Sequence, residues 1–439
     1  MNESPESTAS PFYSKEKPFP RQFWWMCLGA LSFFLSFNII LPELATELRK
    51  RGGDAYVSWL IPLFSMSALI SRPLSGWITD NIGRRWAMVA GCVFCLVAGW
   101  FYPITTTVFT FLMIRVIHGF STGFTPTGFT AYTADVVHPD FRGRAMGWQG
   151  MFNNIGTTLG YAVGAKIALV WGSTSLFYMS SAFAILSLLI FYQLPESRPI
   201  KEKKKFQFKL SQLFFWKAWK PALLMLLVCV SLGSILTVMP DFTLALGYEN
   251  KGYYLSIYIA TSLFFRLISG KISDSLGRSW STAIGTFFQI ISMLILMGLA
   301  MEVYNFQRLQ IAMINKTQLN IWFWISAIGY GLGQGFNAPS LFAWASDTAV
   351  QEQRGRALAM LFMSLELGII IGGLMVGYCI LPPVKVAIDA HAHAVMSGGE
   401  THNMLQPSWD YFKIFGLNLL AFTGAFVFSV AQIIIARKK

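Results

Sequence analysis

Charged side chains are scarce in this sequence. Asp, Glu, Lys and Arg make up 13% of its 439 residues and hydrophobic side chains make up 54%, whereas about 25% of the residues in soluble domains are charged. This composition excludes an ordinary soluble enzyme and predicts a protein that crosses a lipid bilayer several times. The net charge of +13 does not predict nucleic acid binding, because the basic residues punctuate apolar runs instead of gathering on one solvated face.

Catalytic signatures are also absent from the sequence. It holds no H-E-x-x-H and no nucleotide-binding glycine loop, so neither a zinc hydrolase nor an ATP-driven pump is predicted. We expect no enzyme activity and no cofactor, and we find no soluble signalling domain that would indicate a receptor. His391, His393 and His402 lie in one loop beside acidic residues, but their spacing matches no standard metal site. We therefore expect no bound metal.

Cysteine is rare, and all five cysteines fall in apolar segments. We expect them to pack as small buried hydrophobes and not to form a disulfide framework. Cys92 and Cys95 have the C-x-x-C spacing of a redox pair, but they lie in the middle of an apolar run with no second ligand pair. Packing is the expected role there too.

Long apolar runs dominate what is present. About 20 residues are needed to cross roughly 30 Å of hydrocarbon, and the sequence predicts an all-α protein with twelve transmembrane helices in two six-helix bundles. The predicted spans are 22–44, 55–78, 86–104, 108–134, 145–169, 173–194, 219–246, 252–272, 281–302, 320–346, 357–381 and 409–436. Lys and Arg concentrate in alternate connections, which predicts that both termini are cytoplasmic.

The predicted organisation has four parts: a cytoplasmic tail (1–21), a first bundle (22–194), a basic linker (195–218) and a second bundle (219–439). The linker interleaves lysines with aromatic side chains. That pattern suits a segment lying against anionic headgroups, and it equally suits a plain linker that obeys the positive-inside rule.

The most specific pattern is G-x-x-x-D-x-x-G-R-R at residues 76–85, between two apolar runs. Each charge would cost about 2.5 to 3.5 kcal/mol at the bilayer centre, so this segment must be a tight loop at the membrane face. The pattern recurs at residues 270–278, where Arg266 matches Arg72. The recurrence predicts that the chain consists of two duplicated halves.

A second set of matches supports the duplication. The sequence R-G-R-A at 142–145 recurs at 354–357, and the two glycines that follow it in the fifth predicted span recur in the eleventh. These glycines are Gly156 and Gly160 in the first half and Gly368 and Gly372 in the second.

The two loops and the repeat resemble the major facilitator superfamily. The resemblance implies two six-helix halves related by an axis along the membrane normal, with substrate bound near the midplane between them. It also implies that the loop charges lock helix ends together when the cytoplasmic side is closed; charges that only set topology would be worth about 0 to 1 kcal/mol per exposed pair. The predicted gate residues are Gly76, Asp80, Gly83, Arg84, Arg85, Asp135, Arg142, Arg144, Asp274, Arg278, Asp347, Arg354 and Arg356.

Arg115 lies inside the fourth predicted span, in the sequence R-V-I-H-G. It resembles the R-x-x-Q-G motif of the family's fourth helix, with His118 in place of Gln. An arginine at this depth is too costly to face lipid, so we expect it to bind an acid or carbonyl groups in the interior. The resemblance implies a role in proton coupling, and a structural tie between helices is the alternative.

Three acids are predicted proton carriers. Glu366 lies about ten residues into the eleventh span, where an unpaired carboxylate is expensive, and the repeat places Asn154 at the matching position of the first half. That asymmetry suggests a coupling role. Asp241 and Glu43 each follow a proline near the outer ends of their spans, so a gate or structural role is open for both.

The fifth span spaces its glycines in a way that resembles the antiporter motif of drug-exporting members, with Tyr161 and Ala165 in place of a proline and a glycine. Glycines every fourth residue form a smooth face for helix packing. Polar residues predicted to line a substrate cavity, some of which can instead tie helices together, are Asn38, Thr127, Gln149, Asn153, Asn154, Gln334 and Asn337.

The sequence therefore predicts a secondary active transporter that exports a small amphiphilic organic molecule in exchange for protons by alternating access. Proton-coupled uptake of a metabolite and movement of a lipid-like molecule remain open. The predicted partners are the small-molecule substrate, protons and the lipid bilayer, with no nucleic acid, and the chain is expected to act as a monomer. A bacterial inner membrane is the expected location.

Overall fold

The computed structural model describes residues 18–138, 141–197, 215–309, 316–349, 354–380 and 408–437. Most of the predicted tail, the greater part of the linker and the three loop histidines lie outside these ranges. Within them, all regular structure is helical, as predicted. The apolar sequence dictates this result, because a spanning segment must satisfy its backbone hydrogen bonds internally.

The first half of the chain forms α1 to α6 and the second half forms α7 to α13. The bounds are α1 (Arg21–Ile39), η1 (Leu41–Glu43), α2 (Leu44–Arg49), η2 (Asp54–Trp59), α3 (Leu60–Asn81), α4 (Arg84–Phe101), η3 (Tyr102–Ile104), α5 (Val108–Val136), α6 (Arg142–Gln193), η6 (Trp216–Ala218), α7 (Trp219–Ala245), α8 (Tyr253–Leu276), α9 (Arg278–Leu309), α10 (Lys316–Asp347), α11 (Arg354–Ile380) and α13 (Ser408–Arg437).

Nine helices of the described ranges are long and apolar enough to cross a membrane, or ten if the bent α8 is one span. The longest, α6, covers two predicted spans and contains a break at Gly172, whose φ of 80° lies in a region that glycine adopts without steric cost. The total of twelve spans stays a prediction.

The two halves pack internally in the same way. In the first half α1 packs against α6, and in the second α7 packs against α11. Gly156 faces the Leu31 carbonyl on α1, and Gly368 faces the Leu226 carbonyl on α7. In both cases a β-carbon would collide with backbone, so the repeated glycines permit the same close approach in each half.

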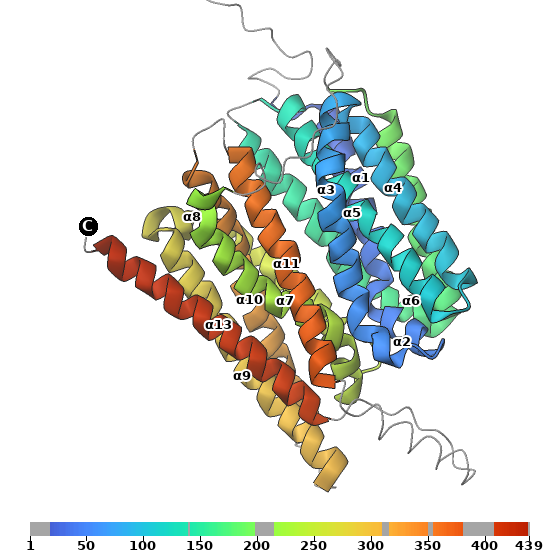
Figure 1. Ribbon diagram of the computed structural model, residues 1–439, viewed down its shortest axis with the longest axis vertical. Helices are drawn as coiled ribbons and strands as arrows, with labels where there is room; N and C mark the ends of the chain where they lie inside the picture. Colours follow the sequence, from blue (N-terminus) through green and yellow to red (C-terminus); the bar gives the residue numbers. More distant parts are fainter. Residues whose placement is uncertain are drawn as a thin grey trace, which may run out of the picture.

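The halves lie side by side, with α13 on the side of the second half away from the first (Figure 1). Between the halves α3 packs against α11, and α6 packs against α8. The helices α3, α5, α8 and α10 all end on the same side of the molecule, which we call the terminal end. The opposite side holds α2 and η2, and we call it the distal end. The second half's core cluster takes in Leu41, Ile61 and Tyr161 of the first half.

The five cysteines are all free and buried, as predicted. Cys95 Sγ lies 3.1 Å from Ser36 Oγ, and Cys92 Sγ lies 3.3 Å from Ser187 Oγ. Each thiol of the C-x-x-C pair therefore contacts a different neighbouring segment, in the packing role that the sequence indicates.

Candidate functional site

Glu366 forms an ion pair between the halves near the middle of the helices. Its Oε1 accepts a hydrogen bond of 2.6 Å from Arg72 Nη2 on α3, and the Arg72 guanidinium also lies 4.9 Å from the ring centroid of Phe362 on α11. Glu366 is 6% exposed. A carboxylate this deeply buried needs a paired cation, and here the other half supplies it.

The other two predicted proton carriers are also paired across the halves, at the distal end. Asp241 on α7 accepts two hydrogen bonds from Arg49 on α2, at 2.9 and 2.5 Å. Glu43 in η1 accepts a hydrogen bond of 2.7 Å from Lys251, which precedes α8. Each half thus gives one acid and one base to the other. The acids could be identified from the sequence, whereas their partners could not.

Arg115 is held by groups of its own half. Its Nε donates to the Leu60 carbonyl at 2.8 Å, and its guanidinium lies 4.2 Å from the centroid of the Phe64 ring. His118 Nδ1 lies 3.5 Å from Arg115 Nη1. Arg115 is 1% exposed, so it faces the interior as expected, and it ties α5 to the start of α3 through a carbonyl group.

Three of the seven predicted cavity residues hold helices together. Asn38 donates to Thr157 on α6 at 3.2 Å, Gln149 accepts from Thr133 on α5 at 2.6 Å, and Asn337 donates to Gln289 on α9 at 2.7 Å.

The other four residues of the set have no hydrogen bond to another helix within the described ranges. Asn153 Oδ1 and Asn154 Nδ2 are buried without a hydrogen-bond partner among the described residues. Thr127 bonds back to Gly123 O at 2.8 Å on its own helix, and Gln334 Nε2 lies 3.4 Å from Tyr330 Oη. Asn153 Oδ1 and Asn154 Nδ2 are therefore unused polar atoms in the interior, and Asn337 Oδ1 is a third such atom of the set.

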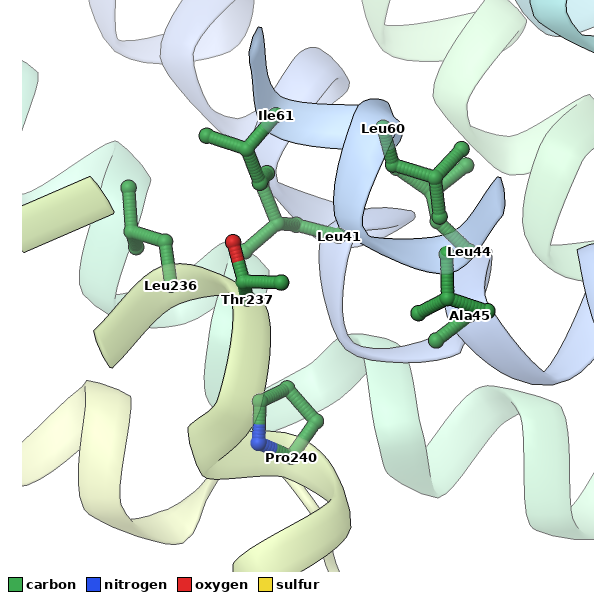
Figure 2. Close-up of a pocket in the computed structure, with 9 residues that line it drawn as sticks. Leu41, Leu44, Ala45, Leu60, Ile61, Leu236, Thr237 and Pro240 are labelled. Atoms are coloured by element: carbon green, nitrogen blue, oxygen red, sulfur yellow. The ribbon is translucent and has the colours of Figure 1, made fainter. Parts of the chain in front are cut away.

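An apolar pocket lies between the halves at the distal end. The space between its side chains is about 280 Å³, part of it open to solvent. Figure 2 shows its side chains approaching from α7 on one side and from η1, α2 and α3 on the other. The lining residues are Leu41, Leu44, Ala45, Val57, Leu60, Ile61, Leu236, Thr237 and Pro240.

The predicted gate charges of the first half pair within that half. Arg84 bonds to Asp135 at 2.9 Å and to Asp80 at 2.9 Å. The Glu196 carboxylate accepts hydrogen bonds from the backbone amides of Arg84 and Arg85, at 2.9 and 3.2 Å. It therefore caps the N-terminus of α4, where negative charge is favourable. This role of Glu196 was not predicted from the sequence.

The second half repeats the pairing of the arginine with two aspartates. Arg278 pairs with Asp274 and, at 2.9 Å, with Asp347. A β-carbon added to Gly76 would meet no atom within 4 Å. The Arg144 guanidinium lies 5.6 Å from the Phe141 ring. The side chains of Arg142, Arg354 and Arg356 lie outside what the structure describes. That these residues lock helix ends together stays a prediction.

Comparison with known proteins gives one family. The family model described as Major Facilitator Superfamily matches residues 26–373. Multidrug resistance protein 1 of Bacillus subtilis (strain 168) is 26% identical over 247 residues, which are 55% of this chain and 62% of that protein. Quinolone resistance protein NorA of Staphylococcus aureus (strain MRSA252) is 24% identical over 243 residues, or 54% and 62%. The matches thus span less than two thirds of these relatives.

Solved structures of transporters share the fold. The nucleoside transporter NupG has a TM-score of 0.69 at 14% identity, with 93% of this chain and 99% of that chain covered. The POT family transporter PepTSo has a TM-score of 0.72 at 11% identity, with 95% and 99% covered. A D-xylose-proton symporter has a TM-score of 0.65 at 19% identity, with 91% and 96% covered.

Proposed function

The chain belongs to the major facilitator superfamily, and on that basis we propose that it is a secondary active transporter that exports a small amphiphilic organic molecule in exchange for protons. The names of the two bacterial relatives, which refer to multidrug and quinolone resistance, support export. We further propose that the terminal end and both termini are cytoplasmic and that the membrane is a bacterial inner membrane.

The observation that carries the proposal is the pairing of three buried acids across the halves. Glu366, Asp241 and Glu43 each bind a cation from the other half. Protonation neutralises a carboxylate, so the pair loses its Coulomb attraction, which is strong where the dielectric is low. Proton binding and separation of the halves are then one coupled event, as a proton-driven alternating-access transporter requires.

The conformation described here is closed at the distal end. The hydrogen bonds and ion pairs between the halves lie between the middle of the helices and the distal end. They join Arg72 to Glu366, Ser256 to Thr158, Asn250 to Ala162, Lys251 to Glu43, and Arg49 to Asp241. Opening the distal side must break the two outer pairs. Protons arriving from that side would favour the break, since they would neutralise Asp241 and Glu43.

The test uses purified protein in liposomes with an imposed pH gradient and a fluorescent amphiphilic dye as the probe. We expect the gradient to drive dye movement against the proton flux. Glu366→Gln, which keeps the side-chain shape but cannot carry a proton, should reduce gradient-driven movement about tenfold or more.

Two results would contradict the proposal. Dye moving in the same direction as the protons would indicate uptake by symport, and equal gradient dependence in the wild type and in Glu366→Gln would remove Glu366 from coupling. Glu302→Gln provides a matched control, because Glu302 on α9 is a partly exposed acid outside the paired set, and it should leave the gradient dependence unchanged.

A further inference from the structure

Two arginines occupy equivalent places in the two halves but have different surroundings. Arg72 on α3 and Arg266 on α8 each precede the repeated loop by the same number of residues. Their helices face the other half in the same way, because α3 packs against α11 and α8 packs against α6. The duplicated architecture therefore creates two related arginine sites between the halves.

In the first site, α11 neutralises and covers the arginine with two side chains. Glu366 accepts a hydrogen bond of 2.6 Å from Arg72 Nη2, and the Phe362 ring, one helical turn away, lies 4.9 Å from the Arg72 guanidinium. A carboxylate and an aromatic face are the two groups that bind a guanidinium most favourably.

In the second site, α6 carries neither group. The register fixed by Gly156 and Gly368 puts Asn154 in the place of Glu366 and Gly150 in the place of Phe362. A β-carbon added to Gly150 would meet no atom within 4 Å, so the space beside this glycine is open. The face of α6 that holds both residues is turned toward α8, because Thr158, one turn beyond Asn154, has its carbonyl 3.5 Å from Ser256 Oγ.

One side-chain nitrogen of each polar residue in the second site is unsatisfied. Arg266 Nε is buried without a hydrogen-bond partner, and so is Asn154 Nδ2. Arg72 Nε shares this feature, but Arg72 has its pair with Glu366, whereas no ion pair to Arg266 occurs within the described part of the chain.

We propose that Arg266 and Asn154 bind the carboxylate of the transported molecule and that the space beside Gly150 accepts its aromatic ring. The substrate class is then an amphiphilic aromatic carboxylate. Its carboxylate and its ring would bind Arg266 as Glu366 and Phe362 bind Arg72. This inference rests on the proposed function, because it identifies what the transporter carries.

The chemistry of Asn154 explains why the site accepts an anion. A glutamate at this position would pair with Arg266 and repel a ligand carboxylate, whereas an amide donates a hydrogen bond to it through Nδ2. An arginine without a counter-charge in a low-dielectric interior is costly. A bound carboxylate offsets that cost through charge-assisted hydrogen bonds, which are stronger than neutral ones.

The first experiment compares three ligands on the unmodified protein in lipid nanodiscs by isothermal titration calorimetry. The probes are 2-naphthoate, 2-naphthalenemethanol, which lacks the charge, and cyclohexanecarboxylate, which lacks the aromatic ring. We expect 2-naphthoate to bind about tenfold or more tightly than either analogue. Equal affinity for naphthoate and naphthalenemethanol would overturn the proposal, and this comparison does not depend on any variant folding.

The second experiment locates the binding site. Asn154→Glu should supply the carboxylate from within the chain, and Gly150→Phe should supply the ring, so each should weaken 2-naphthoate binding about tenfold or more. Gly147→Phe is the matched control, because it adds the same ring one turn earlier on α6 at an exposed glycine with open space, and its affinity should equal that of the wild type. Unchanged affinity in both Asn154→Glu and Gly150→Phe would overturn the proposal.

The two proposals fail in different ways. Gradient-driven dye transport without preferential naphthoate binding would refute the carboxylate site and leave the antiport proposal intact. Naphthoate binding that is lost in Asn154→Glu, in a protein that moves neither the dye nor naphthoate under a pH gradient, would support the binding site and refute proton-coupled transport.

Discussion

At the scale of single residues, the buried charges of Glu366 and Arg72 stabilise each other. Removing one partner of a buried pair leaves an uncompensated charge, which costs about 3 to 5 kcal/mol for a fully buried pair. The cost is smaller here because Arg72 keeps 22% of its side-chain exposure. Arg72→Gln should therefore lower the melting temperature in detergent, and adding Glu366→Gln should recover much of the loss. Equal melting temperatures for the single and double variants would contradict this pairing energy.

The two loop glycines provide a matched pair for a second prediction. Gly83 and Gly277 have φ of 141° and 97°, values that strain any other residue by about 1 to 3 kcal/mol. At Gly83 the Glu196 carboxylate also occupies the place of a β-carbon, whereas Gly277 has open space. Gly83→Ala should thus destabilise the protein more than Gly277→Ala in thermal unfolding, and the reverse order would contradict the capping role of Glu196.

Individual residues also mark the limit of prediction from sequence. Glu366, Asp241 and Glu43 could be identified because acids near or inside apolar runs need a partner. Their partners could not, because Arg72, Arg49 and Lys251 come from the other half, and sequence spacing does not reveal which helices meet between the halves. The repeat contained a usable signal, since it links Arg72 to Arg266 and Glu366 to Asn154.

At the scale of helices, close packing of α1 against α6 depends on small residues. A β-carbon at Gly156 would collide with the Leu31 carbonyl, whereas one at Gly147 on the same helix would meet nothing within 4 Å. Gly156→Ala should separate the helices and lower the yield of folded, monodisperse protein in size-exclusion chromatography. Gly147→Ala should be neutral or stabilise the protein slightly, because alanine favours a helix by about 0.5 to 1 kcal/mol over glycine. Identical behaviour of the two variants would refute the packing argument.

Helix boundaries followed from apolar run length except where a local conformation intervenes. The first predicted span runs from 22 to 44, but α1 ends at Ile39, and Pro42 then lies in the short helix η1. Proline lacks the amide donor that a continuing α-helix needs, so the chain tightens into η1 before α2. At Gly172 the change of direction allows α6 to contain two spans without a long connection.

At the scale of the whole molecule, contact between the halves at the distal end predicts a reversible crosslink. A β-carbon at Gly377 would lie 2.8 Å from Ser58 Cβ, so a small separation reaches the 3.5 to 4.5 Å typical of disulfides. Ser58→Cys with Gly377→Cys should crosslink on oxidation and stop transport, and reduction should restore it. The native cysteines are all buried, and each single variant controls for them. Full transport by the crosslinked protein would show that the contact between η2 and α11 does not need to open.

The duplicated halves could be predicted from the repeat, but the state in which they meet could not. In the proposed alternating-access cycle, two packings that differ by a few kcal/mol would share one set of helices. Only the three-dimensional structure reveals that η2 meets α11 and that Tyr161 joins the core of the second half.

The two outer ion pairs run in opposite directions between the halves: the first half supplies the acid in one pair and the base in the other. Glu43 and Arg49 belong to the first half, and their partners Lys251 and Asp241 belong to the second. Each half therefore contributes one positive and one negative side chain, and separating the two pairs moves no net charge. A single unbalanced charge that crosses the membrane field would contribute about 2.3 kcal/mol per 100 mV. Membrane voltage should therefore have little influence on the separation of these two pairs.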